Sequence, residues 1–156
     1  MKKLYVLVGV PGSGKSTWIK NQEWAKDIPV VSTDRFIETY AEQQGKTYNE
    51  VFDEWMPKAV KLMANQVHIC KANNTDIIWD QTSTTIGARR KKLNMCPEYY
   101  KIAVVFKTPD EEELQRRLNS RIGKAIPENV MRSMKDQLNN EPPTLAEGFD
   151  EIWNAS

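Results

Sequence analysis

Four short apolar runs recur along the 156-residue sequence, separated by longer stretches in which apolar and polar residues mix. The runs are rich in valine, isoleucine and aromatic residues and lack a regular polar face, which is typical of parallel strands buried on both sides. We therefore predict strands at residues 4–8, 28–32, 76–80 and 101–107.

Helix signals fill the stretches between these runs. The best marked helix follows Thr47, because Glu50 three residues later completes a capping-box pattern. A second helix start has Thr108 as its cap, a proline at the first helical position and an acidic first turn. The helix after Thr47 has an apolar stripe at spacings of three and four, formed by Val51, Trp55, Ala59, Leu62, Met63 and Val67. The patterns predict helices at residues 17–26, 35–44, 48–72, 86–94, 109–121 and 127–138, and either a short helix or an edge strand within 145–153.

Strands that alternate with helices indicate an α/β fold with right-handed crossovers. The length suits one domain, residues 1–156, with a four- or five-stranded parallel sheet and helices on both faces. Ligands of such sheets bind beyond the carboxyl ends of the strands. Residues that directly follow the first three runs are therefore expected to face one crevice.

A phosphate-binding motif follows the first predicted strand. Residues 9–16 read Gly-Val-Pro-Gly-Ser-Gly-Lys-Ser and match Gly-x-x-x-x-Gly-Lys-Ser without a mismatch. Glycines let consecutive N–H groups turn inward, and the following helix adds its dipole, so the segment forms an anion site. We expect Lys15 to reach the outer phosphates of a nucleoside triphosphate and Ser16 to ligate Mg²⁺. The expected nucleotide-binding residues of this segment are Gly12, Ser13, Gly14, Lys15, Ser16 and Thr17.

Two aspartates follow the next two predicted strands. Asp34 lies in the turn after the second run, where it is either a general base for an acceptor hydroxyl or a cap on the following helix. Asp80 ends the third run. It binds Mg²⁺ or holds a catalytic neighbour, or else it is a buried carboxylate satisfied by backbone N–H groups. Gln81 and Thr82 are its expected polar companions.

Basic residues form two further candidate groups. Arg117 and Arg121 are four apart and precede Gly123, a spacing that fits either a mobile lid that closes on phosphates or a solvated helix face. The basic run at residues 89–92 either contacts a nucleic-acid backbone or is solvated. Four adjacent charges on one helix cannot all face one ligand.

Composition narrows the function classes. The net charge of +1 excludes a globally basic nucleic-acid binder and still allows a local basic groove. The two cysteines, Cys70 and Cys96, have no metal-like spacing, so we expect buried thiols and a reducing, cytoplasmic location. His68 is the single histidine, and we interpret it as structural. No apolar run is long enough to span a membrane, and no feature demands a protein partner. The tryptophans are expected to pack internally, whereas Phe36, Tyr40 and Tyr48 are candidates for an acceptor pocket.

These motifs, in this order, resemble the 5′-hydroxyl polynucleotide kinases. The resemblance spans nearly the whole chain, and only the phosphate loop is specific by itself. It rests on Gly-Val-Pro-Gly-Ser-Gly-Lys-Ser-Thr-Trp at residues 9–18, Ser-Thr-Asp-Arg at 32–35, Asp-Gln-Thr at 80–82, Arg-Ile-Gly-Lys-Ala-Ile-Pro at 121–127, Met-Arg-Ser-Met at 131–134 and Pro-Pro-x-Leu-Ala-Glu-Gly-Phe at 142–149.

The resemblance implies a P-loop kinase fold with sheet order 2-3-1-4 and a small helical lid. It also implies that ATP and Mg²⁺ are used to phosphorylate the 5′-OH end of DNA or RNA. Carried onto this chain, it makes Asp34 the general base, Asp80 an active-site carboxylate and Arg121 the lid arginine on ATP. Lys15 and Ser16 would handle the phosphates and the metal ion. The compact, kinase-only chain suggests a phage origin.

Two departures from the family pattern bear on the substrate. The phage enzymes carry a substrate-gripping arginine three residues after the base, where this chain has Ile37, and Arg35 is the nearest replacement. The chain ends at Ser156 without room for the phosphatase domain of bifunctional relatives, so no 3′-end healing is expected. The prediction is a polynucleotide 5′-hydroxyl kinase. The alternatives are a P-loop kinase for a small metabolite, an antibiotic or a nucleotide sugar, and a non-catalytic nucleotide-binding module.

Overall fold

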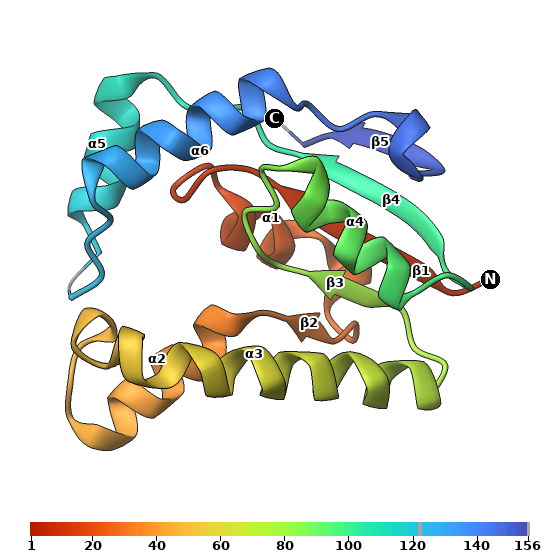
Figure 1. Ribbon diagram of the computed structural model, residues 1–156, viewed down its shortest axis with the longest axis horizontal. Helices are drawn as coiled ribbons and strands as arrows, with labels where there is room; N and C mark the ends of the chain where they lie inside the picture. The colour runs from red at the N-terminus through yellow and green to blue at the C-terminus, as the bar shows by residue number, and fades with distance from the viewer. Residues whose placement is uncertain (122, 156) are drawn as a thin grey trace.

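Five parallel strands form the centre of the molecule (Figure 1). The computed structural model describes residues 1–121 and 123–155, so Ile122 of the quoted motif and Ser156 lie outside the described residues. The sheet order is β2-β3-β1-β4-β5, which confirms the predicted order and adds the last segment as an edge strand. The strands are β1 (Lys3–Val8), β2 (Val30–Val31), β3 (Ile77–Trp79), β4 (Tyr100–Val105) and β5 (Glu151–Asn154).

Helices cover both faces of the sheet because successive strand residues point to opposite sides. Leu4 and Val6 of β1 face the core built with α3 and α4, whereas Tyr5 and Leu7 face the core that contains side chains from α1. The helices are α1 (Lys15–Asn21), α2 (Thr33–Gln44), α3 (Tyr48–Ala72), α4 (Ile86–Met95), α5 (Glu111–Asn119) and α6 (Glu128–Asn140), with 3-10 turns at Glu23–Ala25 and Leu145–Glu147.

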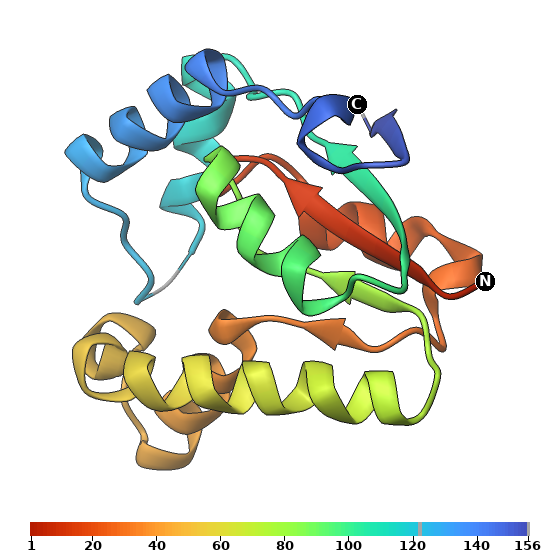
Figure 2. The same cartoon turned by 45° about the vertical axis from the view of Figure 1, so that its right-hand side comes forward.

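Helices α2 and α3 form an antiparallel pair beside the β2 edge of the sheet (Figure 2). The predicted capping box is present, because the Thr47 side chain accepts from the Glu50 amide and the Glu50 carboxylate accepts from the Thr47 amide. Ile37 and Val51 are buried between the two helices. Leu62, a predicted member of the apolar stripe, is instead exposed, since the stripe continues along Ala59, Met63 and Val67.

Several helices begin or end at residues other than those predicted, for local reasons. Helix α1 ends at Asn21 rather than at residue 26, and the chain turns so that Ala25 packs under the sheet. Helix α2 begins at Thr33, which places Asp34 in its first turn rather than in a preceding loop. The cap of α5 is Asp110 rather than Thr108, because its carboxylate accepts from the amide of Glu113.

The lid consists of α5 and α6, which pack on the phosphate loop (Figure 1). Val10 of the loop, Leu114 of α5 and Met131 of α6 form one buried cluster. Arg117 and Arg121 do not share a helix as expected, because α5 ends at Asn119. This arrangement fixes the lid against the loop through apolar contact as well as through charge.

The basic run on α4 is divided: Arg90 and Lys91 are exposed, as in the solvated alternative, whereas Arg89 and Lys92 are buried. Arg89 is fully buried and pairs with Glu147, and it also donates to the carbonyls of Ser83 and Glu141. Lys92 is buried too, with its ammonium 5.6 Å from the ring centre of Trp79. Arg89 therefore secures the C-terminal turn against α4, whereas Lys92 packs over the sheet.

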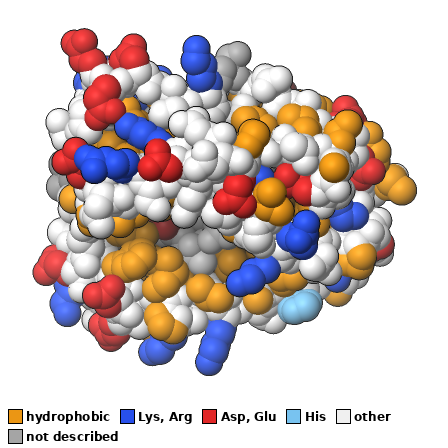
Figure 3. All heavy atoms as spheres, turned by 45° about the horizontal axis from the view of Figure 1, so that its top comes forward, with side chains coloured by type: hydrophobic (Ala, Val, Ile, Leu, Met, Phe, Trp, Pro, Cys, Tyr) orange, Lys and Arg blue, Asp and Glu red, His pale blue; other side chains and the backbone are white. Residues whose placement is uncertain are grey.

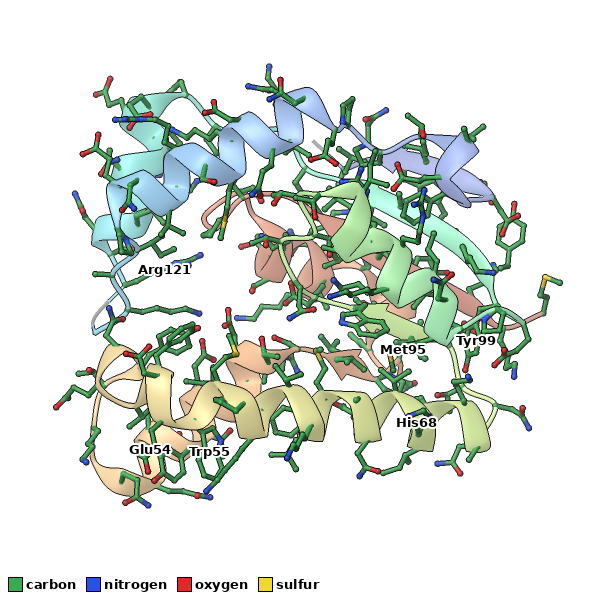
Figure 4. All side chains as sticks on the ribbon, viewed as in Figure 1. Glu54, Trp55, His68, Met95, Tyr99 and Arg121 are labelled. Carbon is green, nitrogen blue, oxygen red and sulfur yellow. The ribbon has the colours of Figure 1, made fainter. Side chains whose placement is uncertain are left out.

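The remaining expectations concern single residues. Cys70 and Cys96 are buried and free, as predicted. His68 lies exposed on α3, far along the helix from its cleft end (Figure 4). Within the described residues, the helices are too short or too polar to cross a lipid bilayer.

The buried Arg89–Glu147 pair is expected to be the most sensitive ionic contact for stability. The variant Arg89→Met should lower the free energy of unfolding by about 3 kcal/mol or more, because Glu147 would remain buried without its partner. Arg90→Met, an exposed neighbour on the same helix, should change it by less than about 0.5 kcal/mol. Urea denaturation measures both values, and equal losses would contradict the assignment.

Candidate active site

A cleft of about 1070 Å³ opens at the carboxyl ends of the strands. The phosphate loop and the start of α1 form its floor, and the lid and α2 contribute opposite walls. The surface is hollowed where the lid faces the α2–α3 pair, and hydrophobic side chains gather beside this hollow (Figure 3). The predicted residues that line the cleft are Gly12, Ser13, Gly14, Lys15, Ser16, Thr17, Asp34, Asp80, Thr82, Arg117 and Arg121.

The backbone conformation of the phosphate loop favours glycine at two positions. Gly12 and Gly14 have φ angles of 83° and 101°, in the region that favours glycine. A Cβ on Gly12 would also lie 3.0 Å from Leu114 of the lid. The loop is anchored to the segment that follows β3, because the Gly9 amide donates to the Thr82 carbonyl at 3.0 Å.

Lys15 begins α1 and turns back over the loop. Its Nζ donates to the carbonyls of Gly9 and Val10 at 2.8 and 3.0 Å. Burial lowers the pKa of Lys15 to about 8, while the nearby Asp80 carboxylate acts in the opposite direction. The ammonium is thus a desolvated charge at the position where the motif predicts outer phosphates.

Asp80 and Ser16 supply a donor set that fits Mg²⁺. Both residues line the cleft, and Mg²⁺ binds to oxygen ligands such as a carboxylate and a hydroxyl. Burial raises the pKa of Asp80, and the charges of Lys15 and Arg35 act against this shift. Within the described residues, the buried Oγ of Ser13 has no hydrogen-bond partner, which leaves the loop with a polar atom for a phosphate oxygen.

Asp34 lies on the opposite wall, with both carboxylate oxygens engaged. The Tyr48 hydroxyl donates to Oδ1 at 2.6 Å, and Lys124 Nζ donates to Oδ2 at 3.1 Å. Burial and the Asp34 hydrogen bond raise the pKa of Tyr48, so its phenol keeps its proton and remains a donor. The contacts fix the orientation of the carboxylate at the cleft.

The two lid arginines have different surroundings. Arg117 donates from Nε to Glu113 at 2.8 Å and from its guanidinium to the Gly12 carbonyl at 2.9 Å, so it rests on the phosphate loop. Arg116 and Arg117 together hold the pKa of Glu113 at about 2. Arg121 points toward the cleft (Figure 4), and its positive charge adds to the lowering of the Lys15 pKa and opposes the rise in the Tyr48 pKa.

Some residues differ from their expected places. Arg35 is exposed and is not among the residues that line the cleft. Its positive charge nevertheless acts to lower the pKa of Asp80. Phe36 packs into the core, and Tyr40 stacks on Trp55 with ring centres 3.8 Å apart. Of the three aromatic candidates, Tyr48 is the one that contacts Asp34.

Sequence reasoning assigned no role to Lys124. The residue lies within the quoted motif at 121–127, and it lines the cleft and contacts Asp34. Its only sequence signal was its place directly after a glycine that follows the lid arginine.

The lowered pKa of Lys15 predicts a pH-dependent stability cost. Below about pH 8, Lys15 is charged in the folded and unfolded chain, so its desolvation lowers wild-type stability by up to about 3 kcal/mol. Between about pH 8 and 10.5 the unfolded chain binds more protons, so this cost disappears as the pH rises. Over this pH range the free energy of unfolding of wild type, measured by urea denaturation, should therefore rise relative to that of Lys15→Met. Lys20→Met controls for loss of a surface charge, and a constant Lys15→Met difference would contradict the prediction.

Comparison with solved structures relates this fold to kinases and to RNA repair. A chain of the Pnkp1/Rnl/Hen1 RNA repair complex is similar at 27% identity, with a TM-score of 0.68 over 89% of this chain and 44% of that chain. The present chain therefore spans less than half the length of that protein.

Small-molecule kinases share the fold. A sugar kinase from Janibacter sp. aligns at 16% identity and a TM-score of 0.63, covering 99% of this chain and 86% of that chain. A shikimate kinase from Bacteroides thetaiotaomicron aligns at 21% identity and a TM-score of 0.53, covering 98% and 86%. At these identities the likeness shows the fold alone.

A family model supplies the assignment. The model described as an AAA domain matches residues 4–142, which include the phosphate loop, both aspartates and the lid. The five-stranded parallel sheet and the likeness to kinase structures agree with this match. The chain therefore belongs to this AAA domain family and has the P-loop kinase fold.

Proposed function

We propose that this protein is an ATP-dependent kinase that phosphorylates the 5′-hydroxyl of a polynucleotide. The observation that carries the proposal is the placement of Asp34 on the cleft wall opposite the phosphate loop, with its carboxylate oriented by Tyr48 and Lys124. A nucleotide-binding module without catalysis would not need an oriented carboxylate there. A kinase needs one, because phosphoryl transfer depends on positioning the acceptor.

The proposed reaction divides the cleft into two sides. On the acceptor side, the proton of the 5′-hydroxyl passes to the Asp34 carboxylate as the hydroxyl oxygen attacks the terminal phosphorus. The bond between that phosphorus and the bridging oxygen breaks, ADP leaves, and Asp34 later returns the proton to water. On the donor side, Lys15 and the loop amides hold the phosphates.

The metal ion and the arginines neutralise charge in this proposal. Ser16 and Asp80 would hold Mg²⁺, which would neutralise negative charge on the phosphates of ATP. Arg117 remains on the loop, and Arg121 acts on the transferring phosphate from the lid. Thr82, which lines the cleft, is kept as a substrate contact in this proposal. Arg35 lies outside the cleft lining and is kept only through its positive charge, which acts on Asp80.

The polymeric substrate is supported by likeness to the RNA repair chain. That likeness covers 89% of the present chain at 27% identity, a higher identity than for the sugar and shikimate kinases. The similar chain is part of a complex with Rnl and Hen1, so we extend the proposal to a protein partner for the present chain.

A small hydroxyl compound is the second candidate acceptor, and specific observations favour it. Ile37, at the position of the substrate-gripping arginine, is fully buried between α2 and α3. Glu38 rather than a basic residue lies one turn beyond Asp34 and shares Lys124 with it. Arg89 and Lys92 are buried and give no support to a nucleic-acid groove.

Replacing the proposed base tests the catalytic assignment. Asp34→Asn should reduce transfer of labelled γ-phosphate to a 5′-OH oligonucleotide by about 10² or more, since the amide cannot take the proton. Its affinity for ATP should stay close to that of wild type. Glu42→Gln, which changes an exposed carboxylate on the same helix, is the matched control. Equal transfer by wild type and Asp34→Asn would remove the base role.

A salt titration distinguishes the two acceptor classes. Binding of a 5′-OH oligonucleotide should weaken with salt, by about sevenfold over a fourfold increase if two phosphates of a single strand are contacted. A neutral nucleoside should show little dependence on salt. Oligonucleotide binding that does not change with salt would favour the small-molecule acceptor.

A further inference from the structure

Residues 123–125, here named the strap, cross from the lid side of the cleft to the start of α3. The amide of Asn49 donates to the Gly123 carbonyl at 3.0 Å. The Asn49 side chain makes two further bonds of 3.0 Å, donating to the Ala125 carbonyl and accepting from the Ala125 amide. Three hydrogen bonds from one residue thus hold the strap to the acceptor-side helices, which lie beside it in Figures 1 and 2.

The close approach of the strap depends on Gly123. Its φ angle is 71°, and a Cβ at this position would lie 2.6 Å from the Cβ of Thr47. Thr47 is the cap of α3, so the strap docks directly on the helix terminus. The contact is specific for a residue without a side chain.

The docked strap directs Lys124 toward Asp34. Lys124 Nζ lies 3.1 Å from Asp34 Oδ2 and 2.9 Å from Glu38 Oε1, and 4.6 Å from the ring centre of Tyr48. The Lys124 side chain is only 19% exposed, less than either carboxylate that it contacts. A surface ion pair would be more exposed and less constrained.

We propose that Lys124, held by the strap, is a positioning residue that orients Asp34 for the acceptor hydroxyl. This inference rests on the proposed function, because Asp34 is the proposed base. Tyr48 holds one oxygen of Asp34 from α3, and Lys124 holds the other from the chain that leaves the lid. Arg121, which lines the same cleft, lies three residues before Lys124 in the sequence.

Two variants separate charge from packing at this position. Lys124→Met removes the ammonium and keeps the length of the side chain, and Lys124→Arg restores the positive charge. Lys135→Met is the matched control, since Lys135 pairs with Glu111 at 2.7 Å within the lid. Steady-state transfer of γ-phosphate to a 5′-OH oligonucleotide gives kcat and the KM for ATP.

The positioning role predicts a selective effect. Lys124→Met should lower kcat about tenfold or more, because a misoriented base loses its near-attack geometry, while the KM for ATP stays within about twofold. Lys124→Arg should regain most of the rate, and Lys135→Met should resemble wild type. Wild-type rates in Lys124→Met, a matching rise in the KM for ATP, or Lys124→Arg as slow as Lys124→Met would each overturn the proposal.

Amide hydrogen exchange tests the strap without any substrate. The amides of Asn49 and Ala125 should be protected in wild type, and Lys124→Met and Asn49→Ala should each speed exchange at Ala125 by about fivefold or more. Unprotected amides in wild type would overturn the strap. If wild type transfers no phosphate to an oligonucleotide while these amides are protected, the proposed function fails and the strap contact stands.

Discussion

The arrangement of this protein depends on keeping a desolvated ammonium at the carboxyl edge of a parallel sheet. Lys15 lies there because β1 ends in a loop whose glycines allow a tight return into α1. Burial lowers its pKa to about 8, and the Asp80 carboxylate at the end of the neighbouring strand β3 offsets part of that cost. The lid adds further positive charge, so the site is poised for a polyanion. The lid packs on the loop through the apolar side chains of Leu114 and Met131 as well as through Arg117.

The cleft wall opposite the phosphate loop holds the carboxylate of Asp34 in a fixed orientation. Helix α2 supplies Asp34 in its first turn, α3 supplies Tyr48, and the segment after the lid supplies Lys124. Two further segments, one 14 and the other 90 residues away in sequence, therefore hold the Asp34 side chain. Such convergence suits a group that must keep a fixed geometry toward an acceptor. On the same side, the buried Ile37 occupies the position where the phage kinases carry a substrate-gripping arginine. The proposed polynucleotide substrate therefore depends mainly on the likeness to the RNA repair chain.

Most elements of the fold, and the position of the phosphate motif at the cleft, were predictable from the sequence because those features are local. Strand runs, the capping box at Thr47 and the phosphate motif each depend on a few consecutive residues, and the sheet order followed from the family resemblance. The features that sequence reasoning missed depend on contacts between distant segments. The buried Arg89 pairs with Glu147, and Lys124 reaches Asp34 from a strap that Asn49 holds. Neither pairing has a periodicity or a motif, so no local pattern could reveal it.

The chemical identity of the acceptor is the most direct test of the proposed activity. Wild-type protein would be incubated with labelled ATP, Mg²⁺ and two oligonucleotides of the same sequence, one with a 5′-hydroxyl and one with a 5′-phosphate. We predict label at the 5′ end of the hydroxyl strand alone. Absence of label on both strands, with ATP binding intact, would contradict the polynucleotide assignment and direct attention to small hydroxyl compounds.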